Sequence, residues 1–244
     1  MTRRGLIGMA AGSAAMLASA SCGLFRPSEE LRYRLTVEVE TPQGLRSGSS
    51  VIEVRGVKNP GWVNPEGRGT RSSFRGEAVA VDLPGGRTLF ALLKSEGGAS
   101  DAADYPYLAF RDRLTDSRDW LESLRRLRGL QGDIAMMPTS ETTIANGGKT
   151  ISSLPRLVTF GNIADPESVE RVDPRALETS FGVGVKLRQI TVQITDDAVT
   201  ADISKRLTWL TSKAVMTNPG WARMSYEARE TIINLFSGTL GDPK

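Results

Sequence analysis

The chain of 244 residues contains no histidine and only one cysteine, Cys22. Ser-His-Asp and Cys-His nucleophilic machinery needs an imidazole base, so this chain cannot build it. Zinc and most transition-metal sites use imidazole or thiolate ligands, and haem held by histidine is excluded for the same reason. We therefore expect no cofactor, and acid-base chemistry is restricted to Asp, Glu, Tyr and Lys.

Long apolar runs are also missing. The main one, Leu6 to Ala20, is diluted by Gly and Ser, and its roughly 15 residues are fewer than the ~20 that a membrane-spanning helix needs. Arg3 and Arg4 precede it and no acid occurs in residues 1–21, which is the layout of an export signal. We predict a cleaved signal peptide over 1–21. The arginine pair resembles the twin-arginine motif, and an ordinary secretory leader is the alternative.

The lone cysteine stands at the end of this leader, in the stretch LASASCG. The stretch resembles the cleavage box of bacterial lipoproteins, in which small residues precede a lipid-modified cysteine. Ser19 stands where that box usually has Leu, and Ala18-Ser19-Ala20 is also a site for the general signal peptidase. We predict lipidation at Cys22, a polar tether over 22–30 and one domain over 31–244.

The charge balance argues against a nucleic-acid partner. The net charge is +3, and removing the leader, which contains two arginines and no acid, lowers it to +1. The basic pI of the full chain therefore does not indicate a DNA- or RNA-binding protein. We expect an exported protein on the periplasmic face of the cell envelope, held to the membrane through Cys22. A soluble periplasmic protein is the alternative, and an envelope protein or glycan is the expected further partner.

Several segments have the patterns of β-strands. Residues 31–40 alternate apolar and polar side chains, which is typical of a strand with one face on the core. Pro84-Gly85-Gly86 lies between two β-rich runs and predicts a hairpin. The apolar phase slips near Arg188-Gln189, which indicates a bulge. The other segments with strand character are 51–54, 77–83, 87–94, 142–160 and 185–194.

Helical periodicity predicts several helices between these strands. The first follows a cap at Asp116 or Ser117 and ends near Gly129, two more start at Asp165-Pro166 and Asp173-Pro174, and the last two cover 200–211 and 225–236. Residues 58–75 are rich in Asn, Pro, Gly and Ser and predict a loop. The expected fold class is α+β: antiparallel sheets with several packed helices in a single compact domain.

One resemblance covers most of the chain after the leader. RYRLTVEV at 32–39, GSSVIEV at 48–54, ADP at 164–166 and FGVGV at 181–185 resemble a family of exported proteobacterial proteins of unknown function. The resemblance implies export and transfers no functional residue.

Carboxylates supply the candidate catalytic and metal-binding residues. Glu38 and Glu40 share the polar face of the first strand, and Glu53 is expected on its partner strand. Such carboxylates suit glycoside hydrolysis, although a charged, solvated sheet face explains them too. Asp196-Asp197 at a strand end are candidate ligands for calcium. Alternatively, they form a turn that leads into the next helix.

The tetrapeptide Asn-Pro-Gly-Trp occurs twice and makes Trp62 and Trp221 candidate binding residues. An aromatic after a Pro-Gly turn either folds back on the core or presents a stacking surface for a sugar or a partner. We predict a non-enzymatic envelope lipoprotein with a binding or structural role. The alternatives are a carboxylate-dependent hydrolase of an envelope polymer and a periplasmic module that binds a lipophilic small molecule.

Overall fold

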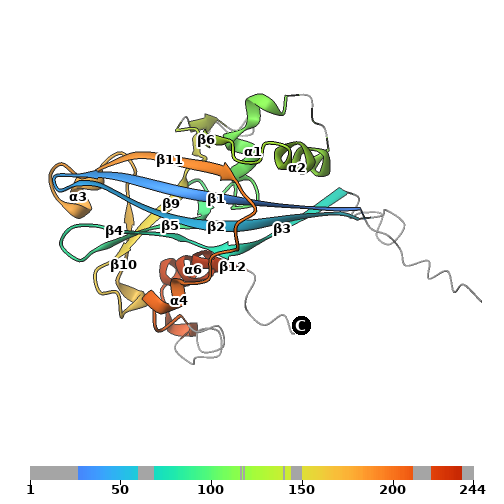
Figure 1. The fold of residues 1–244 in the computed structure, drawn as a ribbon. Coiled ribbons are helices and arrows are strands. Elements are labelled where there is room, and N and C mark those ends of the chain that lie inside the picture. The colour runs from blue at the N-terminus through green and yellow to red at the C-terminus, as the bar shows by residue number, and fades with distance from the viewer. Residues whose placement is uncertain are drawn as a thin grey trace, which may run out of the picture.

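The structure is a computed structural model (Figure 1) that describes residues 27–59, 69–115, 117, 119–139, 141–143, 150–210 and 221–237. Arg3, Arg4, Cys22 and Trp62 lie outside these residues, so the predictions made for them stay predictions. In the part of the chain that is described, no helix has the length and apolar character needed to cross a membrane.

The first sheet has six antiparallel strands in the order β12-β3-β2-β1-β11-β6. Its first strand shows the predicted alternation, because every odd residue from Leu31 to Val39 is buried and the even residues between them are not. The strand begins before residue 31, so residues 28–30 of the predicted tether are part of the sheet. The strands are β1 (Ser28–Thr41), β2 (Gly44–Asn59), β3 (Gly69–Glu77), β6 (Ile134–Met136), β11 (Lys186–Ile194) and β12 (Phe236–Ser237).

The second sheet has four antiparallel strands in the order β10-β9-β5-β4, and β7 and β8 form a separate pair. All residues of β9 and all but one of β5 are buried, which is typical of central strands covered on both faces. The strands are β4 (Val79–Asp82), β5 (Thr88–Ser95), β7 (Glu141–Thr143), β8 (Thr150–Ser152), β9 (Pro155–Phe160) and β10 (Val169–Val172).

The two sheets come into close contact where β4 crosses β2. The chain passes from β3 in the first sheet to β4 in the second through Ala78. At the crossing, a Cβ on Gly48 would stand 2.0 Å from the carbonyl oxygen of Ala80. Only glycine permits this approach of two backbones.

Short helices cover both ends of this sandwich. In Figure 1, α1 and α2 lie over the first sheet near the start of β1, and α4 and α6 lie below the second sheet. Asp119 caps α2 by accepting a hydrogen bond from the Leu121 N–H. The helices are α1 (Tyr105–Ala109), η2 (Arg111–Arg113), α2 (Trp120–Arg128), η3 (Pro166–Ser168), α3 (Leu177–Phe181), α4 (Ile203–Arg206), η4 (Trp221–Arg223) and α6 (Tyr226–Leu235).

Two apolar clusters hold these layers together. The larger contains the inward side chains of β1 and β2, the facing side chains of β4 and β5, and residues of α1 and α2. The smaller lies between the outer face of the second sheet and the C-terminal helices, and Phe90, Phe160, Leu207 and Leu235 all belong to it. The C-terminal helices therefore cover the face of the second sheet that is turned away from the first.

The predicted α+β fold class with several packed helices is wrong. The described chain is mostly antiparallel β-sheet, and its helices are short. Asp165-Pro166 opens only a three-residue 3-10 turn, and α3 starts at Leu177 rather than at Pro174. The predicted loop over 58–75 is wrong too, because β3 occupies residues 69–77 and pairs with β2.

Candidate functional site

The predicted carboxylates lie on the solvent-facing side of β1 and β2. Glu38 accepts a hydrogen bond from Gln189 Nε2 at 2.9 Å, and Arg188 Nε is 3.6 Å from the same carboxylate. Glu40 is 4.0 Å from Arg188. Both carboxylates are therefore held by β11, the neighbouring strand.

Glu53 lies between two arginines on adjacent strands. Arg32 Nε donates to it at 2.8 Å and Arg75 Nη2 at 3.3 Å. Burial disfavours the charged carboxylate, but the Arg32 hydrogen bond and the charge of Arg75 outweigh it and lower the pKa of Glu53. A general acid needs the opposite shift.

Glu53 does not converge with Glu38 and Glu40. Glu53 is opposite Arg32 in the register of β1 and β2, and Arg32 precedes Glu38 by six residues. At about 3.3 Å per residue, roughly 20 Å separates Glu53 from Glu38. Glycosidase carboxylates stand closer, at about 5 to 9.5 Å.

Asp196 and Asp197 follow β11 and are exposed. Asp197 accepts a hydrogen bond from Thr195 Oγ1 at 2.7 Å and pairs with Arg34 at 2.6 Å, and these contacts lower the pKa of Asp197. In the described ranges, no group of three or more His, Cys, Asp or Glu could hold a metal ion. Asp197 instead positions a segment whose Thr200 bonds both backbone groups of Val51.

Trp221, the described one of the two candidate tryptophans, lies on η4. It is partly buried and packs against the cluster between the second sheet and the C-terminal helices. Of the two alternatives for this side chain, packing on the core or presenting a stacking surface, the structure therefore shows the first.

A cleft of about 540 Å³ opens between β11 of the first sheet and the β9–β10 side of the second. A bulge forms part of its floor. Val39 pairs with Leu187 and Glu38 with Gln189, so Arg188 is the extra residue on β11. Because of it, Leu187 and Ile190 are three positions apart and both line the cleft. Leu154, Val172 and Pro174 complete the apolar lining.

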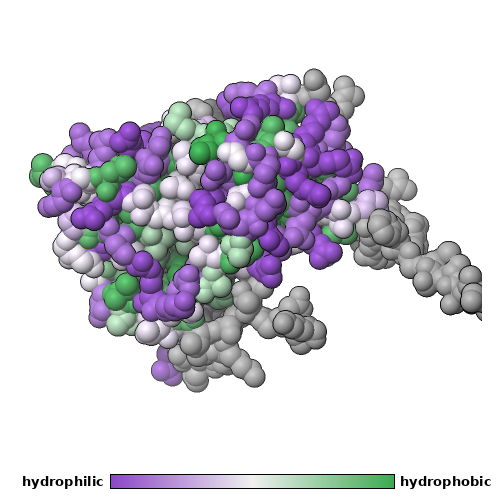
Figure 2. All heavy atoms as spheres, viewed as in Figure 1, coloured by the Kyte–Doolittle hydropathy of each residue, from purple (hydrophilic) through white to green (hydrophobic). Residues whose placement is uncertain are grey.

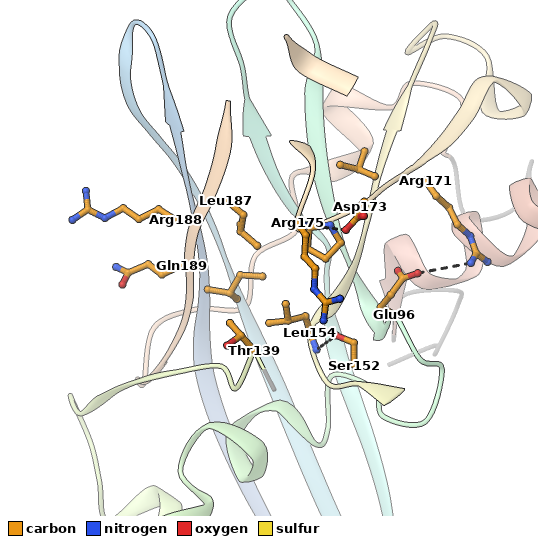
Figure 3. Close-up of a pocket in the computed structure, with 13 residues that line it drawn as sticks. Glu96, Thr139, Ser152, Leu154, Arg171, Asp173, Arg175, Leu187, Arg188 and Gln189 are labelled. Carbon is orange, nitrogen blue, oxygen red and sulfur yellow. Dashed lines mark hydrogen bonds and ion pairs between the residues drawn. The ribbon is translucent and has the colours of Figure 1, made fainter. Parts of the chain in front are cut away.

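Polar side chains form the rim of this cleft (Figure 3). Arg175 extends into it toward Ser152 and Leu154, whereas Arg188 and Gln189 point away from it, toward the outer face. The turn that carries Arg175 is held by Asp173, whose Oδ1 accepts the Arg175 N–H at 2.8 Å.

A network of charged residues forms one wall. Arg171 lies 3.9 Å from Glu96, and Arg156, which is 5% exposed, donates to Glu230 of α6 at 2.9 Å. Burial opposes ionisation of Glu230, but Arg156 and Lys94 outweigh it and lower its pKa. Arg156 Nε and Glu96 Oε2 are buried without a hydrogen-bond partner, 3.8 Å apart. The network fixes α6 to the second sheet beside the cleft.

The two carboxylates that line the cleft are both engaged. Glu96 lies near Arg156 and Arg171, and Asp173 holds its own turn. Burial and the nearby Asp101 raise the pKa of Asp104, but Asp104 does not line the cleft. The arrangement suits binding of a molecule with apolar and polar parts rather than proton transfer.

Fold and cleft together define a β-sandwich protein with a cleft between β11 and the β9–β10 side of the second sheet. Comparisons with family models, curated proteins and solved structures found no match. The resemblance to exported proteobacterial proteins therefore stays a prediction. Sequence reasoning did not identify Arg175 or Leu154 as site residues. The bulge near Arg188 was the one feature of this site that the sequence pattern predicted. The pattern did not predict which strands lie opposite the bulge.

Proposed function

We propose that this protein is a non-enzymatic lipoprotein of the bacterial cell envelope that binds a ligand in the cleft between β11 and β10. Export and the lipid anchor at Cys22 rest on the leader, with a soluble periplasmic protein as the alternative. A small envelope component, or an extended segment of an envelope protein or glycan, has the dimensions that such a cleft accepts.

The observation that carries the proposal is the lining of the cleft. Leu154, Leu187 and Ile190 supply an apolar floor, and Arg175 with Ser152 and Thr139 supplies polar groups above it. A few polar groups over an apolar floor orient a ligand that the apolar contacts retain. The hydrolase alternative lacks comparable support. Glu53 is far from Glu38 and is paired with Arg32. Glu38 and Glu40 are both near Arg188 on the solvent-facing side of the sheet, and neither lines the cleft.

Thr139→Trp tests the proposal. Thr139 is exposed and lines the cleft, so an indole there fills the site without entering the core. Thr179→Trp on α3 is the matched control, because Thr179 is also exposed and lies outside the cleft. Native mass spectrometry of protein purified from envelopes measures the bound molecule.

We expect a bound species in the wild type and in Thr179→Trp, and its loss from Thr139→Trp. Equal occupancy in both variants would place the ligand elsewhere. Wild-type protein that carries no bound species, even after incubation with envelope extract, would overturn the proposal.

A further inference from the structure

Six exposed cations surround the first residues of β1. Pro27 is the first residue described, and its carbonyl accepts the backbone N–H of Lys58 at 2.9 Å. Ser28 pairs with Val57, which in turn pairs with Arg71. The six are Arg55 and Lys58 on β2, Arg71 on β3, and Arg125, Arg126 and Arg128 on α2.

Three carboxylates lie among these cations and leave an excess of positive charge. Glu29 pairs with Arg125 at 2.7 Å and with Arg128 at 3.7 Å, and Glu122 pairs with Arg126 at 2.5 Å. The third carboxylate, Glu30, is directed to Arg32 at 3.6 Å.

Among the residues that the structure describes, the strand cations have no such neutralising partner. Within the described part of the chain, Arg55, Lys58 and Arg71 make no ion pair. Figure 2 shows hydrophilic residues covering this end of the molecule, over α2 and the ends of the long strands. We call the six cations together, three on β2 and β3 and three on α2, the basic end.

The basic end lies next to the predicted anchor. Five residues, 23–27, separate Cys22 from Ser28, and even a fully extended chain of that length spans only about 20 Å. A lipid on Cys22 would therefore hold the start of β1, and the cations around it, close to the headgroups. Surface potentials act within about a Debye length, roughly 8 Å at physiological ionic strength.

We propose that the basic end docks on anionic phospholipid headgroups and sets the orientation of the domain on the membrane. The idea builds on the lipid anchor of the proposed function, because the anchor brings these cations to the bilayer. In this orientation β1 points away from the membrane, and the turn between β1 and β2 is the membrane-distal end (Figure 1).

The test uses the chain with Cys22→Ser, expressed with its leader and recovered after export, so that no lipid contributes to binding. Flotation with vesicles of equal parts phosphatidylcholine and phosphatidylglycerol is compared with flotation with phosphatidylcholine alone. The test variant adds Arg55→Gln, Lys58→Gln and Arg71→Gln. The control variant instead removes three exposed cations elsewhere, Arg46→Gln, Lys186→Gln and Arg223→Gln.

We expect binding only to the anionic vesicles, at low salt, and its loss at high salt. Each cation removed from a membrane-facing surface costs about fivefold in affinity, so the test variant should bind on the order of 100-fold more weakly. The control variant should bind as the parent does.

Equal weakening of test and control variants would show only a dependence on net charge and would overturn the proposal. Absence of binding by the parent, or equal binding to both vesicle types, would also overturn it. The lipid anchor is measured separately by fatty-acid labelling of Cys22, so a failure there leaves this vesicle result standing, and a failure here leaves the anchor standing.

Discussion

Arg125 of α2 donates two hydrogen bonds to one carboxylate oxygen of Glu29 on β1, from Nε at 3.0 Å and from Nη2 at 2.7 Å. Glu29 is the second residue of the strand, and its side chain is only 15% exposed. The contact therefore ties α2 to the first residues of β1.

Replacing the Glu29 carboxylate should weaken the attachment of α2 to β1. Glu29→Gln keeps the size of the side chain and removes its charge, so we expect the free energy of unfolding to fall by about 1 kcal/mol. Urea unfolding at neutral pH measures the change. Glu30→Gln is the matched control, because Glu30 is more exposed and only 3.6 Å from Arg32. Equal losses in the two variants would contradict the special position of Glu29.

The crossing of β2 and β4 depends on one glycine. In Gly48→Ala the added Cβ would meet the Ala80 carbonyl oxygen at 2.0 Å, so the two backbones must separate. We expect a loss of about 3 kcal/mol or more, or failure to fold. Ser47→Ala, at the neighbouring exposed position, should change stability by less than about 0.5 kcal/mol. Thermal unfolding of both variants checks the prediction, and near-equal melting temperatures would refute it.

Arg156 and Glu230 should be strongly coupled. Their side chains are 6% and 14% exposed and are joined at 2.9 Å. Removing one partner of a buried ion pair leaves the other charge uncompensated, so Arg156→Met should cost about 3 kcal/mol. In the double variant with Glu230→Gln, the loss should be at least about 1 kcal/mol smaller than the sum of the single losses. Strict additivity in this double-mutant cycle would rule out the coupling.

Stability should fall at acid pH, partly through Glu53. Its folded pKa is below the unfolded value of about 4.3. The stabilisation is therefore complete above that unfolded value and is lost as pH falls through the folded pKa. Glu53→Gln should lower the free energy of unfolding at pH 7 by on the order of 1 kcal/mol and flatten its decline toward acid.

Urea unfolding across this acid range measures both effects. Glu40→Gln is the control on the same sheet face, because Glu40 is 4.0 Å from its nearest arginine. An unchanged slope in Glu53→Gln would show that this carboxylate has no part in the pH dependence.

Local patterns predicted the elements that are stabilised locally. The alternation of β1, the hairpin at Pro84-Gly85-Gly86 and the bulge at Arg188 are all confirmed. The helix over 225–236 is confirmed as α6, with Ser225 as its cap. In each, the signal is a period or a turn residue that acts within a few positions.

Elements that depend on distant partners were predicted wrongly. The strand expected over 51–54 is the middle of a longer one. The Gly- and Ser-rich residues 44–50 belong to β2 as well, because they pair with β1 and cross β4 at Gly48. The polar stretch 69–77 is a strand for a similar reason, since it adds to β2. Composition predicted a loop over 58–75, and tertiary pairing overrode it.

The cleft could not be predicted either, because its lining residues come from five separate parts of the chain. Leu154, Val172 and Leu187 each looked like an ordinary strand or helix residue in the sequence, and only the stacking of two sheets brings them together. The carboxylates that the sequence singled out are spread over the solvent-facing side of a sheet. Every second residue of a strand points to that side, so polar residues gather there without forming a site.

Metabolic labelling with a fatty acid tests most directly the central claim, that Cys22 anchors an envelope lipoprotein. Wild-type protein and Cys22→Ser are expressed in a bacterial host, labelled and recovered from fractionated envelopes. We predict label on the wild type in the membrane fraction, and an unlabelled Cys22→Ser protein in the soluble periplasmic fraction. A wild-type protein without lipid, or equal label on both proteins, would contradict the account.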